Sequence, residues 1–147
     1  MNSDYNYEYL PILGSQSFID NSIKLAYGEN AKSIKENRVA GLQSLSGTGA
    51  CRVAGDFFRK YLKNSRNFIN LTLIIFLASV YLPNPTWPNH NNIFTDSGLP
   101  IKQYRYYDPK TKGLDYKGLV EDISNAPEGQ IVLFHACAHN PTGQSFI

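Results

Sequence analysis

Apolar side chains follow two patterns along this chain: the three-to-four-residue spacing of an amphipathic helix, and short unbroken runs typical of buried strands. The helical spacing predicts helices over residues 15–27, 50–62, 90–98 and 113–125. The short runs predict strands over residues 39–45, 80–82, 101–107 and 130–136. Gly28 and Gly98 follow two of the helices as stops, and Asp115 is placed to open the last one.

The order of these elements predicts the fold class. Strands that alternate with helices favour an α/β fold with a mainly parallel sheet, right-handed crossovers and flanking helices. We expect the strand over 130–136 to be central in that sheet. A chain of 147 residues can bury one core, so the sequence predicts one domain over residues 1–147.

The composition limits the class of protein. Hydrophobic residues make up 42% of the chain and charged residues 18%, which is typical of a globular protein and not of a disordered one. The formal net charge of +2, with Lys and Arg scattered, does not favour a nucleic-acid partner. Cys51 and Cys137, with no signal-like start, indicate free thiols in a reducing compartment, so we expect a cytoplasmic protein.

One apolar segment, residues 68–79, departs from the alternation of helices and strands. No charged side chain occurs between Arg66 and His90. A membrane-spanning helix needs roughly 20 apolar residues, and this run ends before reaching that length, because Pro83 follows. We therefore expect no membrane partner. Loose membrane association through this segment is the alternative.

Small polar residues before the second predicted helix indicate an anion site. Ser46, Gly47 and Thr48 stand between a predicted strand and a predicted helix, where backbone N–H groups and the positive end of the helix dipole can hold an anion. Their spacing is neither a dinucleotide fingerprint nor a nucleotide-binding P-loop. The plain alternative is a strand-to-helix turn with Thr48 as its cap.

The end of the chain holds a second group of candidate ligands. His135, Cys137 and His139 alternate on a predicted strand, so their side chains would share one face, as the ligands of a zinc site do. No fourth ligand and no general-base carboxylate lies near them in the sequence. We therefore expect core packing and no metal here, and a His/Cys metal-binding domain is the disfavoured alternative.

Five segments together resemble one family. They are Glu8-Tyr9-Leu10-Pro11-Ile12, Leu45-Ser46-Gly47-Thr48-Gly49-Ala50, Asn84-Pro85-Thr86-Trp87-Pro88-Asn89-His90, Tyr104-Arg105-Tyr106-Tyr107-Asp108 with Gly113-Leu114-Asp115, and His135-Ala136-Cys137-Ala138-His139-Asn140-Pro141-Thr142-Gly143. The set is similar to the large domain of the fold-type I pyridoxal-phosphate aminotransferases, and most closely to the aspartate aminotransferases. The resemblance implies that residues 1–147 are a partial large domain that binds pyridoxal phosphate, interrupted by 68–79.

The resemblance also implies which residues hold the phosphate of that cofactor. Ser46, Gly47 and Thr48 match the segment that cradles it. Tyr9 matches a tyrosine that reaches the phosphate bound by the other subunit of a homodimer. Tyr9 is one of ten tyrosines in this chain, so packing against a surface is its plain alternative.

Three further residues match positions around the cofactor ring and the substrate. Trp87 matches a tryptophan that stacks on the pyridine ring and meets a substrate carboxylate, with core packing as its alternative. Asn140 matches an asparagine that donates to the phenolic oxygen of the cofactor and lies at the substrate. His90 matches a histidine that supports the aspartate at the pyridine nitrogen, with a surface helix position as its alternative. Asn84–Pro85 and Asn140–Pro141 match peptide bonds that are cis in this family.

By resemblance, the complete enzyme transfers an amino group between aspartate and 2-oxoglutarate, a dicarboxylic amino acid and a 2-oxo acid. The family's Schiff-base lysine lies beyond the matched segments, and Lys24, Lys60 and Lys117 have no resembling context. We therefore expect this chain alone to be inactive. The alternative is a truncated subunit that acts by binding to full-length enzyme.

Overall fold

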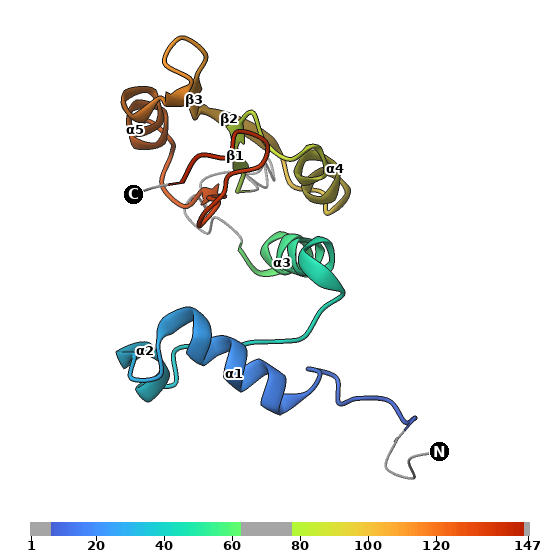
Figure 1. Ribbon diagram of the computed structural model, residues 1–147. Coiled ribbons are helices and arrows are strands. Elements are labelled where there is room, and N and C mark those ends of the chain that lie inside the picture. Colours follow the sequence, from blue (N-terminus) through green and yellow to red (C-terminus); the bar gives the residue numbers. More distant parts are fainter. Residues whose placement is uncertain (1–6, 63–77, 146–147) are drawn as a thin grey trace. The chain divides into compact units, whose positions relative to one another are not determined.

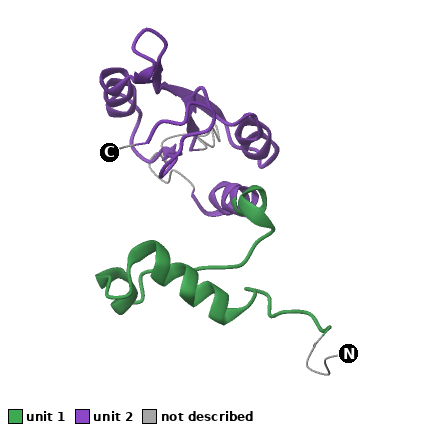
Figure 2. Ribbon diagram, viewed as in Figure 1, with its two compact units in different colours: residues 1–50 green, residues 51–147 purple. Residues whose placement is uncertain are grey.

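The computed structural model describes residues 7–62 and 78–145, and Figure 1 gives the order of their helices and strands. The chain divides into two compact units, residues 1–50 and residues 51–147 (Figure 2), and each is described by itself. Most of the segment 68–79 falls outside the described residues, so its interpretation as an insertion stays a prediction. Within the described residues, no helix is both long and apolar enough to cross a membrane.

Unit 1 is built around helix α1, Gln16–Tyr27, followed by the short helix α2, Lys32–Lys35. Gly28 ends α1 as predicted: its φ is 85°, and its N–H donates to the carbonyl of Lys24 at 2.8 Å. The expected strand over 39–45 is wrong. This apolar run packs along α1 instead of pairing with a strand, and a Cβ on Gly41 would stand only 2.8 Å from Cγ2 of Ile19.

Helix α3, Ser46–Tyr61, begins in unit 1 and continues into unit 2. It starts at Ser46 and not at residue 50, so the predicted turn at Ser46, Gly47 and Thr48 is already the first turn of the helix. Farther along, Gly55 is buried against the residues that end α4. A Cβ on Gly55 would meet Oγ of Ser97 at 2.5 Å, so only a glycine permits this close approach.

A parallel three-stranded sheet forms the centre of unit 2. Strands β2 (Ile101–Arg105), β1 (Val80–Asn84) and β5 (Ile131–Val132) lie in the order β2-β1-β5, and Val80 pairs with both Ile101 and Ile131. The parallel α/β architecture is therefore confirmed for this unit. The strand predicted over 130–136 is shorter than expected, and it lies at an edge of the described sheet, because β1 is the central strand.

Two helices and a hairpin complete unit 2. Helix α4, Pro88–Asp96, follows β1, and helix α5, Tyr116–Ser124, follows an antiparallel hairpin of β3 (Tyr107–Asp108) and β4 (Gly113–Leu114). The strand predicted over 101–107 is thus divided between β2 and β3. Figure 1 shows the sheet between α4 and α5.

Strand β1 is buried on both faces, which explains its unbroken apolar sequence. On one face, Val80 and Leu82 pack with Phe94 of α4 and with Leu99. On the other face, Tyr81 belongs to a second cluster. The other buried members of that cluster are Tyr104, Tyr106 and Leu119.

The predicted cap of α5 is confirmed: Oδ1 of Asp115 accepts a hydrogen bond from the N–H of Gly118 at 2.8 Å. Asp115→Ala removes this acceptor, and we expect the free energy of unfolding to fall by about 1 kcal/mol. Asp115→Asn keeps an oxygen acceptor and should lose only a few tenths of that in urea denaturation. Equal losses in the two variants would show that the capping bond is not the cause.

Candidate functional site

The first turn of α3 presents Ser46, Gly47 and Thr48, all of them exposed. Ser46 has a φ of 54°, and the first helical hydrogen bond runs from the N–H of Gly49 to the carbonyl of Leu45 at 2.9 Å. The N–H groups before Gly49 therefore have no partner inside the helix, and no acidic side chain occupies this turn. Such a turn can accept an anion, because its N–H groups carry the positive end of the helix dipole.

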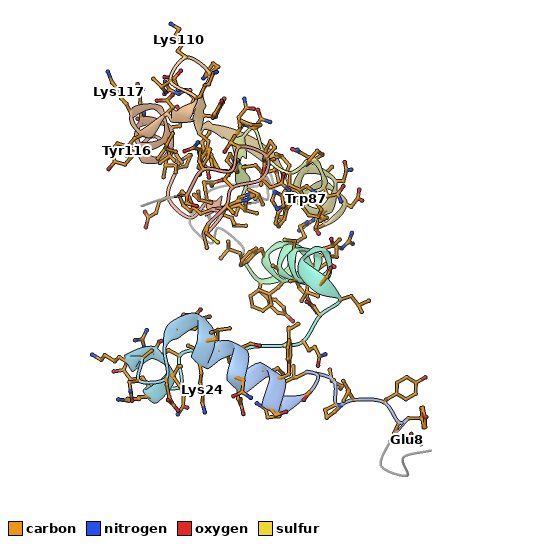
Figure 3. The ribbon with its side chains drawn as sticks, in the orientation of Figure 1. Glu8, Lys24, Trp87, Lys110, Tyr116 and Lys117 are labelled. Atoms are coloured by element: carbon orange, nitrogen blue, oxygen red, sulfur yellow. The ribbon has the colours of Figure 1, made fainter. Side chains whose placement is uncertain are left out.

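Trp87 and His90 lie where strand β1 passes into helix α4, and Figure 3 labels Trp87 at that position. The Asn84–Pro85 peptide bond between them and the strand is cis, as expected. Trp87 is half-buried, and the edge of its ring system meets the His90 ring with 5.2 Å between centroids. Its ring is thus held by the start of α4, and it is not enclosed in a core.

His90 is a buried residue, so the surface alternative for this position is wrong. Its side chain is 7% exposed, and Nδ1 lies 2.8 Å from Oγ1 of Thr86, one helical turn earlier. Burial lowers the pKa of His90 below its ordinary value, and the nearby His135 adds to that effect. His90 is therefore a neutral ring that hydrogen-bonds to Thr86.

Asn140 lies in the turn that follows strand β5, and the Asn140–Pro141 peptide bond is cis, as expected. The backbone N–H of Asn140 donates to Nδ1 of His135 at 3.2 Å. Its side-chain amide is exposed and makes no hydrogen bond within the described residues. The amide is therefore free to donate to a ligand.

All three histidines of the chain gather beside this turn. The ring of His135 lies 5.3 Å from that of His90 and 4.3 Å from that of His139, and His139 stacks on Tyr106 at 3.9 Å between centroids. We call His90, His135 and His139 the histidine cluster. Burial is the main cause that lowers the pKa of each member, and the pKa of His139 falls to about 4. The cluster is uncharged at neutral pH.

The structure removes the basis of the metal-site alternative. Strand β5 ends at Val132, so His135, Cys137 and His139 do not alternate along a strand, and Cys137 is exposed while His139 is buried. Among the residues that the structure describes, no three His, Cys, Asp or Glu side chains are grouped as metal ligands.

The carboxyl ends of two neighbouring parallel strands bring part of the predicted site together. Trp87 and His90 follow β1, and Asn140 follows β5, in the region where open α/β sheets bind ligands. The other predicted residues, which are Ser46, Gly47, Thr48 and Tyr9, belong to unit 1. Tyr9 is fully exposed, so it does not pack against a surface among the described residues.

Sequence reasoning missed the supporting contacts of Thr86, Tyr106 and Thr142. Thr86 lies four residues before His90, and that spacing across a helix start is a usable signal. Tyr106 and Thr142 gave no such signal, because their contacts with His139 depend on how the turn folds back on the sheet. The lysines that lacked a resembling context, Lys24, Lys60 and Lys117, are exposed on helices, and Figure 3 labels the first and last of them.

Comparison with known proteins identifies the family. Residues 3–146 match the family model described as "Aminotransferase class I and II". The chain is 49% identical over 141 residues to a mitochondrial aspartate aminotransferase from Dictyostelium discoideum, covering 96% of this chain and 30% of the relative. It thus spans about a third of the length of the curated relatives that it matches.

Solved structures agree with this match. The fold superposes on a cytoplasmic aspartate aminotransferase from Saccharomyces cerevisiae with a TM-score of 0.84 and 39% identity, covering 98% of this chain and 32% of that one. It also superposes on an aromatic-amino-acid aminotransferase from Burkholderia pseudomallei, solved covalently bound to pyridoxal phosphate, with a TM-score of 0.81 and 33% identity over 94% of this chain and 31% of the other. Because the relatives include mitochondrial and cytoplasmic proteins, the cytoplasmic location stays a prediction. The predicted resemblance is confirmed, and the chain belongs to the class I and II aminotransferases, with the fold of a partial fold-type I large domain.

Proposed function

We propose that this chain is the part of an aspartate aminotransferase that binds the phosphate and the ring of pyridoxal phosphate. The observation that carries the proposal is the gathering of Trp87, His90 and Asn140 at the carboxyl ends of β1 and β5, in a chain 49% identical to an aspartate aminotransferase. The substrates of the whole protein are then aspartate and 2-oxoglutarate. The bound cofactor supplies an electron sink for chemistry at the amino-acid Cα.

Each residue has a task that its geometry permits. Ser46, Gly47 and Thr48 donate to the phosphate from the first turn of α3, where no acidic side chain competes. The half-buried ring of Trp87 covers one face of the pyridine, and its indole N–H meets a substrate carboxylate. Asn140 donates its exposed side-chain amide to the phenolic oxygen.

The histidine cluster offers an independent test of whether the residues of the site fit a bound ligand. His135 accepts at Nδ1 from Asn140, so its hydrogen is assigned to Nε2. That Nε2 is buried and has no partner among the described residues. Buried donors of this kind are normally satisfied, so the site needs a group from outside this set. The orphaned donor belongs to the ring that accepts from Asn140, and this supports a ligand-binding role.

A partner subunit is also proposed, through the segment around Tyr9. Apolar side chains of that segment are strongly exposed: Tyr9, Leu10 and Ile12 are all open to solvent. A contiguous set of exposed apolar residues favours a protein partner. We propose that this segment contacts a second aminotransferase subunit and that Tyr9 reaches the phosphate bound there.

The test uses pyridoxamine phosphate, which has no aldehyde and so forms no imine with surface lysines. Trp87 is the only tryptophan, so saturable quenching of its fluorescence reports a ligand bound near that position. We expect saturable quenching by the wild-type chain. Asn140→Ala should weaken binding roughly tenfold or more, because a hydrogen bond to a charged oxygen is worth about 1.5–3 kcal/mol.

Asn21→Ala, on an exposed position of α1, is the matched control and should bind like wild type. Thr48→Val should also weaken binding. Quenching that does not saturate, or equal affinity in the Asn140 and Asn21 variants, would refute the proposed site.

A further inference from the structure

The turn that carries Asn140 is closed by hydrogen bonds on both of its sides. The N–H of His139 donates to the carbonyl of Gln144 at 2.8 Å, and the N–H of Gly143 donates to the carbonyl of His139 at 2.6 Å. The N–H of Ala138 donates to Oγ of Ser145 at 2.9 Å. These bonds bracket Asn140, so the direction of its side chain depends on the geometry of the turn.

His139 is the most deeply buried of the residues that fix this turn to the rest of unit 2. It is completely buried, and its ring stacks almost parallel on Tyr106, with 18° between the planes. Tyr106 is itself buried in the cluster that packs under α5. A buried ring held on a buried tyrosine has little freedom to move. The backbone of Asn140, the next residue in the chain, is therefore attached to a fixed neighbour.

Thr142 links His139 to the far side of the turn. Its Oγ1 lies 2.9 Å from Nδ1 of His139, and it also accepts a long hydrogen bond of 3.4 Å from the N–H of Gln144. The pair therefore spans the Asn140–Pro141 segment, with His139 before it and Thr142 after it. Unlike the backbone bonds, this side-chain link can be removed without changing the main chain.

We propose that His139 and Thr142 are positioning residues for Asn140, and that their hydrogen bond holds the turn from which its amide reaches a ligand. The proposal rests on the proposed function for the identity of that ligand, the phenolic oxygen of the cofactor. Its physical basis is preorganisation: a donor that is already in place loses no further conformational freedom when it binds.

The experiment compares three variants of the 147-residue chain. Thr142→Val removes the hydroxyl but keeps the shape, Thr142→Ser keeps the hydroxyl, and Thr111→Val removes a hydroxyl from the exposed β3–β4 hairpin as a control. Backbone and side-chain amide signals of Asn140 are followed by NMR, with amide exchange. We expect the signals to move toward random-coil positions in Thr142→Val only, while the signals of β1 and β2 stay unchanged.

Binding of pyridoxamine phosphate is measured in parallel. Thr142→Val should weaken binding about as much as Asn140→Ala does, and the double variant should be no weaker than either, because both changes remove the same interaction. Thr142→Ser should restore binding. Unchanged Asn140 signals in Thr142→Val, or a further loss of affinity in the double variant, would overturn the proposal.

The two arms separate this proposal from the proposed function. If the wild-type chain does not bind pyridoxamine phosphate, the proposed function fails, and the NMR arm still decides whether Thr142 positions Asn140. If the fold of Thr142→Val is lost, the β1 and β2 signals reveal it, and Thr142→Ala, which also removes the hydroxyl, takes its place in both measurements.

Discussion

Replacing Phe94 with alanine is expected to lower the free energy of unfolding of unit 2 by about 3–5 kcal/mol, the range for removing a buried phenylalanine. Phe94 is 4% exposed and packs with Val80, Leu82 and Leu99 on one face of β1. The loss of stability has two parts. The variant no longer gains the free energy of burying the phenylalanine ring away from water, and the cavity that the missing ring leaves is itself unfavourable. Because single domains are stable by only about 5–15 kcal/mol, the variant should be close to unfolding.

Urea denaturation followed by far-ultraviolet circular dichroism measures this effect. Phe57→Ala is the matched control, because Phe57 lies on α3 but is 56% exposed. We expect the control to lose well under half as much as Phe94→Ala, since about half of its ring already faces water. A similar loss in both variants would contradict the assigned core.

The change at Phe94 should also reach the candidate site. Phe94 lies on α4 one turn after His90, and the two rings are 6.5 Å apart. Trp87 stands at the start of the same helix. A shift of α4 toward the cavity would therefore move both site residues, so we expect the folded fraction of the variant to show altered Trp87 fluorescence.

Sequence patterns predicted those elements whose signals are local. The stop at Gly28 and the cap at Asp115 are properties of a few neighbouring residues, and both are confirmed. The strand predicted over 80–82 is also confirmed as part of β1, because a strand buried on both faces needs an unbroken apolar run.

The failures share a different cause, which is dependence on a distant partner. The apolar run at 39–45 has the composition of a strand, yet it packs on α1. The last strand stops at Val132 because the chain turns toward the histidine cluster, although the N–H of Leu133 still donates to the carbonyl of Tyr81 at 3.0 Å. In both segments, contacts with residues distant in the sequence determine the structure, and the periodicity of apolar residues carries no information about those contacts.

The candidate site was predictable as a set of residues but not as an arrangement. Trp87, His90 and Asn140 were identified from motifs that resemble a family. Their gathering depends on the pairing of β1 with β5, which places the segments after the two strands side by side. The burial of His90 and the stacking of His139 on Tyr106 also required the structure, because residue type alone allows a histidine to lie inside or outside.

Acid is expected to destabilise unit 2 between about pH 6.5 and pH 4, through His139. Burial, and then the neighbouring His135 and His90, lower the pKa of His139 to about 4, whereas an unfolded histidine has a pKa near 6.5. Between about pH 6.5 and pH 4, His139 therefore binds a proton in the unfolded chain but not in the folded chain. The stability is greatest above that pH and is lost as the pH falls through this window, by on the order of 3 kcal/mol.

Other groups of unit 2 with shifted pKa values either add to this loss of stability in acid or act in a different pH range. His90 and His135 also have lowered pKa values, so their contributions have the same sign. The carboxyl groups of Asp108 and Asp122 are held charged by hydrogen bonds, which lower their pKa values below the ordinary 3.8. Their contribution is lost only at still lower pH, so the two windows are separate.

Urea denaturation at half-unit steps from pH 7.5 to pH 4 measures the slope, and an NMR titration of the His139 ring measures its pKa directly. His139→Phe keeps an aromatic ring against Tyr106 but cannot take up a proton, so its stability should change much less with pH over this range. A constant loss at every pH is also expected, because Thr142 loses its partner. If the free energy of unfolding changed equally with pH in wild type and in His139→Phe, protonation of the His139 ring would not be the cause of the loss of stability in acid.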